Sequence, residues 1–253
     1  MTESTLTVKP ASRAEVVSER QRPAAKNFIA AIWASVIGKK IVMAVTGVVL
    51  ILFVLAHMAG NLKIFAGPDE INAYSHFLRD VGYPEFGNGQ LLWLVRSVLL
   101  ISVLLHITAA VQLTRINWRA RPAGYSDKKN VETTLGALTM RWSGVLLAIF
   151  VIFHLAHFTF GAVGFEPGQF VHLAVYQNVV AGFSVWPIAV FYILAMAALC
   201  LHLDHGIWST FQTLGWNTAD NKPVLRTLSR IIAIIVFLGF SSVPVAVLLG
   251  WVR

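Results

Sequence analysis

The sequence has few charged residues and almost no cysteine. Only 13% of its 253 residues are Asp, Glu, Lys or Arg, whereas 57% are hydrophobic. A water-soluble domain has about 25% charged residues, so this chain carries too few to solvate a soluble fold of its size. The single cysteine, Cys200, excludes a disulfide framework within the chain and any metal site built only from its thiolates. The composition therefore excludes an ordinary cytosolic enzyme and a disordered protein.

Long apolar segments are present instead. A helix needs about 20 apolar residues to span the hydrocarbon core of a bilayer. The segments that reach this length are residues 41–66, 90–114, 142–164, 185–211 and 229–252. Residues 28–37 predict a short amphipathic helix on the membrane surface, and residues 1–27 predict a polar cytoplasmic tail without a signal peptide. The expected fold is an all-α membrane protein, with residues 28–253 as one five-helix domain.

Lysine and arginine predict the orientation of the spans. Most of the 20 basic residues lie in the N-terminal segment through Lys40 and in the loops 115–141 and 215–230. Because basic loops are retained in the cytoplasm, the N-terminus is expected there and the C-terminus outside. The outer loops 67–90 and 164–183 contain Gly and Pro, which predict folded caps.

The first and third spans share a pattern. Residues 46–57 read TGVVLILFVLAH and residues 143–154 read SGVLLAIFVIFH. In each, a hydroxyl residue and a glycine are followed by a histidine ten residues after the glycine. The second and fourth spans each carry a late histidine with a small residue four positions on, and these histidines are His106 and His202. The chain therefore resembles two copies of a two-helix unit plus a fifth helix.

Depth along the spans pairs the four histidines. At about 1.5 Å per residue, His57 and His154 fall in the outer half of the membrane and His106 and His202 in the cytoplasmic half. Ionisable residues inside spans are costly and usually functional. Two such pairs match two stacked haems, because each haem iron takes two axial imidazoles and small residues one turn away admit the flat porphyrin. The alternative is histidines that only hydrogen-bond between helices.

Two further histidines leave the ligand assignment open. His157 and His205 each lie three residues after a paired histidine and share its helix face, so either member of each H-x-x-H is a candidate ligand. The repeat register favours His154 over His157, which is then a candidate contact of a propionate or a quinone.

Two other residues near these histidines also stand out. Arg96 lies within the second span, where a charge needs a partner, such as a haem propionate or Glu85. Cys200 precedes His202 by two residues and is either an iron ligand or a small buried hydrophobe.

A quinone site needs an apolar slot and hydrogen-bonding groups for two carbonyl oxygens. The candidates on the cytoplasmic side are Trp33, Ser35, Lys39, Lys40, Ser143 and Asp204. The candidates on the outer side are Tyr74, His76, Arg96 and His157. The sequence favours neither side.

These motifs resemble a known family. The T-G-x9-H string of the first span and the H-x-x-H-G-x-x-S-x-F-Q-T-x-G string that ends the fourth are similar to the single-chain cytochrome b anchor of succinate:quinone oxidoreductase, respiratory complex II. The likeness covers about residues 30 to 252. Its most specific strings are HMAGNLKIF (57–65), NAYSHFLRDVG (72–82) and HLDHGIWSTFQTLGW (202–216).

The resemblance implies a subunit of succinate dehydrogenase in a bacterial cytoplasmic membrane, with succinate oxidised on another chain. A flavoprotein subunit and an iron–sulfur subunit would dock on the cytoplasmic face, and electrons would pass to membrane quinone. The axial iron ligands implied are His57, His106, His154 and His202. They would hold two haem b groups, or a non-haem iron or iron–sulfur centre at some of the same histidines. A higher oligomer of the complex remains open, and no nucleic-acid partner is expected.

Two other functions would use the same features. One is the cytochrome b anchor of a formate dehydrogenase or a hydrogenase, which also reduces quinone but has other partners. The second is a transporter with a histidine proton relay. Transporters more often show helices broken by Gly or Pro in mid-span, and here only residues 241–244 suggest such a break.

Overall fold

The structure, a computed structural model, describes residues 27–120 and 135–253. These residues form helices α2 (Phe28–Ala34), α3 (Val36–Leu62), α4 (Pro68–Asp80), α5 (Gln90–Arg119), α6 (Leu135–His154), α7 (Val175–Ser184), α8 (Trp186–Thr213) and α9 (Lys222–Leu248), with a 3-10 turn η1 (Lys63–Ala66) and a π-helical turn η2 (Leu155–Thr159). Five helices, α3, α5, α6, α8 and α9, are long and apolar enough to cross a membrane. The expected class, an all-helical protein with five spans, is confirmed.

Capping sets helix boundaries that hydropathy alone misplaces. Ser35 has an extended backbone, and its hydroxyl accepts a hydrogen bond from the Gly38 N–H at 2.8 Å. This N-cap ends α2 at Ala34 rather than at 37 and starts α3 at Val36 rather than at 41. α6 likewise begins at Leu135, ahead of the apolar stretch expected from 142, and its span ends with η2 at Thr159 rather than at 164.

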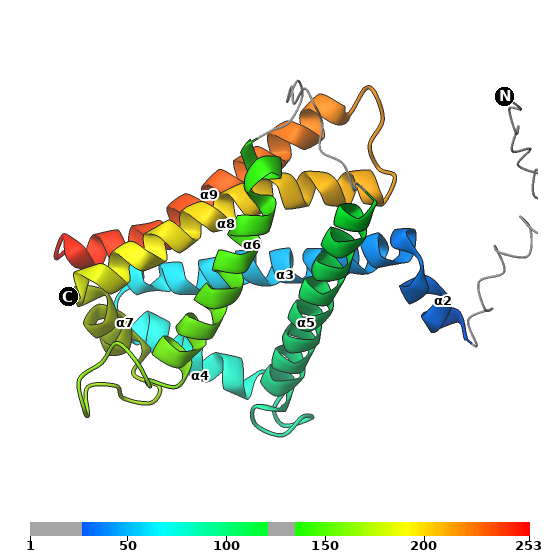
Figure 1. Cartoon of the computed structure of the whole chain (residues 1–253). Helices are drawn as coiled ribbons and strands as arrows, with labels where there is room; N and C mark the ends of the chain where they lie inside the picture. The colour runs from blue at the N-terminus through cyan, green and yellow to red at the C-terminus, as the bar shows by residue number, and fades with distance from the viewer. Residues whose placement is uncertain (1–26, 121–134) are drawn as a thin grey trace, which may run out of the picture.

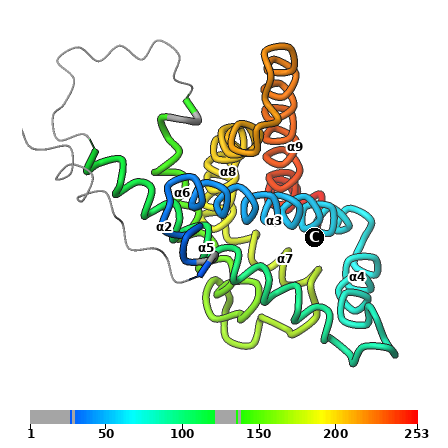
Figure 2. Tube along the Cα trace, turned by 90° about the vertical axis from the view of Figure 1, so that its right-hand side faces the viewer, coloured from blue at the N-terminus to red at the C-terminus, as the bar shows by residue number. Residues whose placement is uncertain are grey.

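The spanning helices associate in two pairs. α3 packs against α5, and α6 packs against α8. α9 runs alongside α8 and also contacts α3, so it joins the pairs (Figures 1 and 2). α5 makes at most marginal backbone contact with α6 and α8 in the described chain. The pairs α3/α5 and α6/α8 correspond to the two copies that the sequence pattern suggests.

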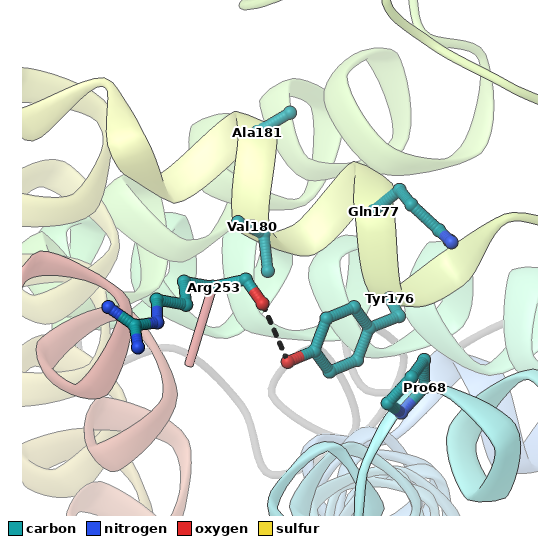
Figure 3. A pocket seen from close by; sticks show the side chains of 6 residues that line it. All are labelled: Pro68, Tyr176, Gln177, Val180, Ala181 and Arg253. Atoms are coloured by element: carbon teal, nitrogen blue, oxygen red, sulfur yellow. Dashed lines mark hydrogen bonds between the residues drawn. The ribbon is translucent and has the colours of Figure 1, made fainter. Parts of the chain in front are cut away.

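The two ends of the bundle differ. α4, α7 and the C-terminus lie at one end, and α2 and the α8–α9 connection lie at the other (Figure 1). We call these the α4/α7 end and the α2 end. The loops 67–90 and 164–183 are folded, as predicted, because α4 and α7 pack together and the Tyr176 N–H donates to Asn72 Oδ1 at 3.1 Å. Their junction borders a cavity of about 380 Å³, in which the Tyr176 hydroxyl donates to the Arg253 carbonyl (Figure 3).

Apolar side chains form two buried clusters and an apolar outer surface. One cluster joins α6, α7, α8 and α9 around Phe150, Phe183 and Tyr192, and the second joins α3, α8 and α9 around Met58 and Val236. The outward faces of the spans are apolar, as a lipid-facing surface requires. Six exposed tryptophans lie near the ends of spans, where amphipathic rings prefer the headgroup region: Trp93, Trp118, Trp142, Trp186, Trp216 and Trp251.

Candidate redox-cofactor site

The four candidate ligand histidines form two pairs across the bundle. The His57 ring on α3 lies 5.9 Å from the His154 ring on α6, centroid to centroid. The His106 ring on α5 lies 6.4 Å from the His202 ring on α8. Each pair therefore takes one histidine from α3/α5 and one from α6/α8. These are the pairs that the depth estimate gives, and their role as iron ligands stays a prediction.

Hydroxyl groups contact the Nδ1 atoms of three of these histidines. Thr46 Oγ1 is 3.2 Å from His106 Nδ1, and Ser143 Oγ is 3.3 Å from His202 Nδ1. Nδ1 of His154 is 3.4 Å from the Tyr192 hydroxyl. In each case Nδ1 is engaged within the protein, so Nε2 is the nitrogen left for another ligand.

His157 lies apart from the pairs. Its ring is fully buried beside Phe158 and Phe165, and its Nδ1 is 3.0 Å from the Tyr192 hydroxyl. Its Nε2 is buried without a hydrogen-bond partner in the described chain. Only His154 of this H-x-x-H faces His57, which supports the repeat register, and His157 instead shares the Tyr192 hydroxyl with His154.

The spacing of each pair suits a shared iron. Two metal–imidazole bonds of about 2 Å each, plus the reach from nitrogen to ring centre on either side, would separate the centroids by about 6 Å. The observed separations are 5.9 and 6.4 Å. The two imidazoles of each pair are thus separated by a distance at which they would hold one iron between them.

The described residues around each pair supply only the two imidazoles. Within residues 27–120 and 135–253, no group of three or more His, Cys, Asp and Glu side chains is placed to hold a metal ion. A non-haem iron of the facial-triad type needs three protein ligands, whereas a haem supplies four nitrogens of its own. Two imidazoles at each pair are the donors that a haem iron would take from the protein.

The other cofactor candidates on α8, Cys200 and His205, lie outside the two histidine pairs. Cys200 packs against the apolar cluster of α3, α8 and α9, as a small hydrophobe would. His205 is half-buried and follows Asp204, whose carboxylate pairs with Arg226 of α9 at 3.3 Å.

Arg96 is exposed on α5, and its guanidinium lies 5.0 Å from the centre of the Trp93 ring. No ion pair to Arg96 forms within the described residues, so the predicted pair with Glu85 is absent there. The pKa of nearby Arg79 on α4 is lowered by burial and by the charge of Arg96, and Asp80 opposes this shift. A propionate as the partner of Arg96 stays a prediction.

The quinone candidates at the α2 end fall into separate groups. Trp33, Ser35 and Lys39 are together, because the buried Lys39 ammonium donates to the Trp33 carbonyl and lies 5.9 Å from the centre of its ring. Ser35 caps α3. The Ser143 and Asp204 side chains instead contact His202 and Arg226.

The candidates at the α4/α7 end are also dispersed. The Tyr74 ring packs over Gly60, where an added Cβ would lie 2.7 Å from its Cε1. His76 is exposed, whereas His157 is buried beneath α7. These side chains do not form one pocket in the described chain, and a quinone role for any of them stays a prediction.

The sequence pattern missed one residue of this site, Tyr192. It is 6% exposed and lies on α8 between His154 and His157. A tyrosine in the middle of an apolar span was the available signal, because a buried phenol hydroxyl requires a hydrogen-bond partner.

Comparison with known proteins finds one family model that matches part of the chain. The family model of the succinate dehydrogenase/fumarate reductase transmembrane subunit matches residues 125–241. Comparisons with curated proteins and with solved structures gave no match. Subunits of this family are of the cytochrome b type and anchor an enzyme complex in the membrane. The resemblance found in the sequence is thus confirmed over residues 125–241, where the chain is similar to the transmembrane subunits of succinate dehydrogenase/fumarate reductase.

Proposed function

We propose that this chain passes electrons from an iron–sulfur subunit, docked at the α2 end, to membrane quinone. His57 with His154 and His106 with His202 would each hold one haem b. The observation that supports this most directly is the pair of histidine contacts, at 5.9 and 6.4 Å, one nearer each end of the bundle. When bound, haem supplies one-electron transfer between two oxidation states of its iron.

The protein's own contribution is orientation and insulation. The hydroxyls of Thr46, Ser143 and Tyr192 contact Nδ1 of three of the histidines. The apolar side chains around the pairs keep water away, and a dry environment favours neutral imidazole over imidazolium. Neutral imidazole with a free Nε2 is the form that binds iron.

The charge of the α2 end suits the docking of soluble subunits. Basic side chains near this end are Lys39, Lys40, Arg115, Arg119, Arg141, Lys222, Arg226 and Arg230. The α4/α7 end carries acidic side chains as well, including Asp69, Glu70 and Asp80. Charge complementarity steers association, and basic ends are retained in the cytoplasm. We therefore assign the α2 end to the cytoplasm of a bacterial cell and expect an acidic partner surface there.

The decisive experiment replaces both histidines of the pair nearer the docking end. In the purified complex of His106→Ala/His202→Ala, we expect quinone reduction to be lost while succinate-dependent reduction of an artificial dye persists. Flavin chemistry takes place on another chain, whereas this pair would be the first acceptor in the membrane. The measurement is the rate of quinone reduction divided by the rate of dye reduction, together with haem per flavin.

His172→Ala is the control, because this histidine is exposed in a loop at the other end of the bundle. The control should keep the wild-type ratio and haem content. If the histidines were only structural, quinone and dye reduction would fall together with the amount of assembled complex. A wild-type ratio in the double variant would show that these histidines carry no electrons.

A further inference from the structure

The hydroxyl residue and the glycine that begin each copy of the repeat contact the histidine of the neighbouring helix. Thr46 Oγ1 lies 3.2 Å from His106 Nδ1, and a Cβ added to Gly47 would lie 3.6 Å from His106 Cε1. In the other pair of helices, Ser143 Oγ lies 3.3 Å from His202 Nδ1, and a Cβ added to Gly144 would also lie 3.6 Å from Cε1 of that ring. The same arrangement thus occurs twice, once on α3 and once on α6.

The hydrogen on each hydroxyl is already committed. Thr46 Oγ1 donates to the Val42 carbonyl at 2.7 Å, and Ser143 Oγ donates to the Met140 carbonyl at 3.1 Å. A hydroxyl has only one hydrogen to donate. Toward the imidazole each oxygen therefore accepts, and the Nδ1–H of the histidine donates.

A backbone carbonyl gives an independent check for His106. Its Nδ1 is 3.1 Å from the Met43 carbonyl oxygen, which can only accept. Nδ1 must therefore carry the proton. A neutral imidazole has one N–H, so Nε2 presents a lone pair.

We propose that Thr46 and Ser143 are positioning residues that hold His106 and His202 as Nδ1–H tautomers, with Nε2 free for a shared iron. This rests on the proposed function, because it assumes that the pair binds haem. Partners on the second nitrogen of a metal-bound histidine fix its tautomer and ring orientation and raise its basicity. The hydroxyl and glycine of the repeat then position the histidine of the neighbouring helix, as Thr46 and Gly47 do for His106. The histidine ten residues after the glycine belongs to the other histidine pair, His57 with His154.

Thr46 and Ser143 are not equivalent, so the proposal predicts effects of different size for their substitution. His106 keeps the Met43 carbonyl as a second acceptor when Thr46 loses its hydroxyl. The Nδ1 atom of His202 has no acceptor other than Ser143 in the described chain. Ser143→Ala should therefore perturb the shared haem more than Thr46→Val does.

The direction of the effect follows from ligand basicity. An imidazole that donates from Nδ1 gives more electron density to the iron and stabilises its oxidised form. Without the acceptor, the reduced-to-oxidised ratio of this haem at a fixed ambient potential should rise. We expect a rise of about twofold to tenfold for Ser143→Ala, the range of one net hydrogen bond, where tenfold corresponds to about 59 mV for one electron. Thr46→Val should change the ratio less.

The test is a redox titration of the purified complex, followed by haem absorbance and by the electron paramagnetic resonance signal of the ferric haem. Ser143→Thr keeps a hydroxyl and should restore the wild-type ratio. Ser229→Ala is the matched control, because Ser229 is also buried but donates only to the Leu225 carbonyl, at 2.8 Å. Loss of this haem in Ser143→Ala, with recovery in Ser143→Thr, would support the proposal equally.

Two outcomes would overturn it. One is a Ser143→Ala complex with the wild-type ratio and resonance signal. The second is a change that Ser143→Thr fails to reverse. If Ser143→Ala does not assemble, Thr46→Val against Thr46→Ser tests the hydroxyl at His106, where the expected rise is smaller because the Met43 carbonyl remains as an acceptor. A wild-type complex without haem would refute the proposed function itself, whereas a haem-containing wild type with an unaltered variant refutes only the role of the hydroxyls.

Discussion

Gly182 on α7 is the position where one added methyl group should have the clearest effect. A Cβ at this residue would lie 2.7 Å from His157 Nε2, 2.8 Å from its Cε1 and 3.1 Å from Phe158 Cε1. The His157 ring is fully buried and is held on its Nδ1 side by the Tyr192 hydroxyl at 3.0 Å. A Cβ at Gly164 would also lie 2.8 Å from this ring. The ring is confined by both segments, so it cannot yield to Gly182→Ala without breaking its contact with Tyr192.

Two opposing contributions to the free energy of unfolding set the size of the Gly182→Ala effect. Overpacking a well-filled core costs about 1–3 kcal/mol. Alanine inside a helix is favoured over glycine by roughly 0.5–1 kcal/mol. The net loss for Gly182→Ala is then about 1–2 kcal/mol, which for a chain of this size lowers the melting midpoint by about 2–8 °C.

The assay compares thermal unfolding of the purified complex at one scan rate in two backgrounds. In the His157→Ala background the two shortest contacts are removed, and Phe158, at 3.1 Å, can move into the vacated space. The helix preference should then prevail, so Gly182→Ala should raise the midpoint instead of lowering it. The reversal of sign distinguishes a steric clash from a general intolerance of substitution in α7. An unchanged or raised midpoint in the wild-type background, or an equal loss in both backgrounds, would refute the packing argument.

Two further predictions concern single polar contacts. Asp204→Asn should lower the melting midpoint by a few degrees, because Asp204 and Arg226 are only 16% and 20% exposed and their ion pair joins α8 to α9 at 3.3 Å. The loss should be largely absent in an Arg226→Gln background, because removing one partner of a buried ion pair costs more than removing both. Tyr192→Phe removes the hydroxyl shared by His154 and His157. If the proposed haems are bound, we expect the spectrum of the one at His57 and His154 to shift while the other keeps its spectrum, and spectra unchanged from wild type at both sites would contradict this.

The sequence predicts the presence of the five spanning helices more accurately than it predicts their first and last residues. Five apolar runs predict five spans, because only a helix satisfies its backbone within the hydrocarbon core. Hydropathy, however, marks where the apolar surface starts and not where the backbone turns. α6 begins at Leu135 although Arg141 lies within its first two turns, and α3 begins at the Ser35 cap although Lys39 and Lys40 follow. Basic side chains at these places are expected at the membrane boundary, while the helix itself continues past them.

The pairing of the histidines could be predicted because the depth of a residue in the membrane depends only on its position along the helix axis. Counting residues along each helix places His57 near His154 and His106 near His202, and the ring contacts agree. The rotation of each helix about its axis cannot be counted in this way. His157 lies only three residues from His154, yet it packs beneath α7 because Gly164 and Gly182 leave room for its ring. Tyr192 joins the site only through the packing of α8 on α6.

The side-chain contacts explain why the hydroxyl, glycine and histidine of the repeat occur in both two-helix units. Within each two-helix unit, the hydroxyl and glycine of one helix contact the histidine of the next, as Thr46 does with His106. Across the units, each pair takes one histidine from α3/α5 and one from α6/α8. Neither unit can therefore complete a two-histidine site alone. In the described chain the backbone of α5 makes at most marginal contact with α6 and α8, so a group bound at both pairs would add links between these helices. Since a ligand stabilises the state that binds it, cofactor binding and the association of the two halves would reinforce each other.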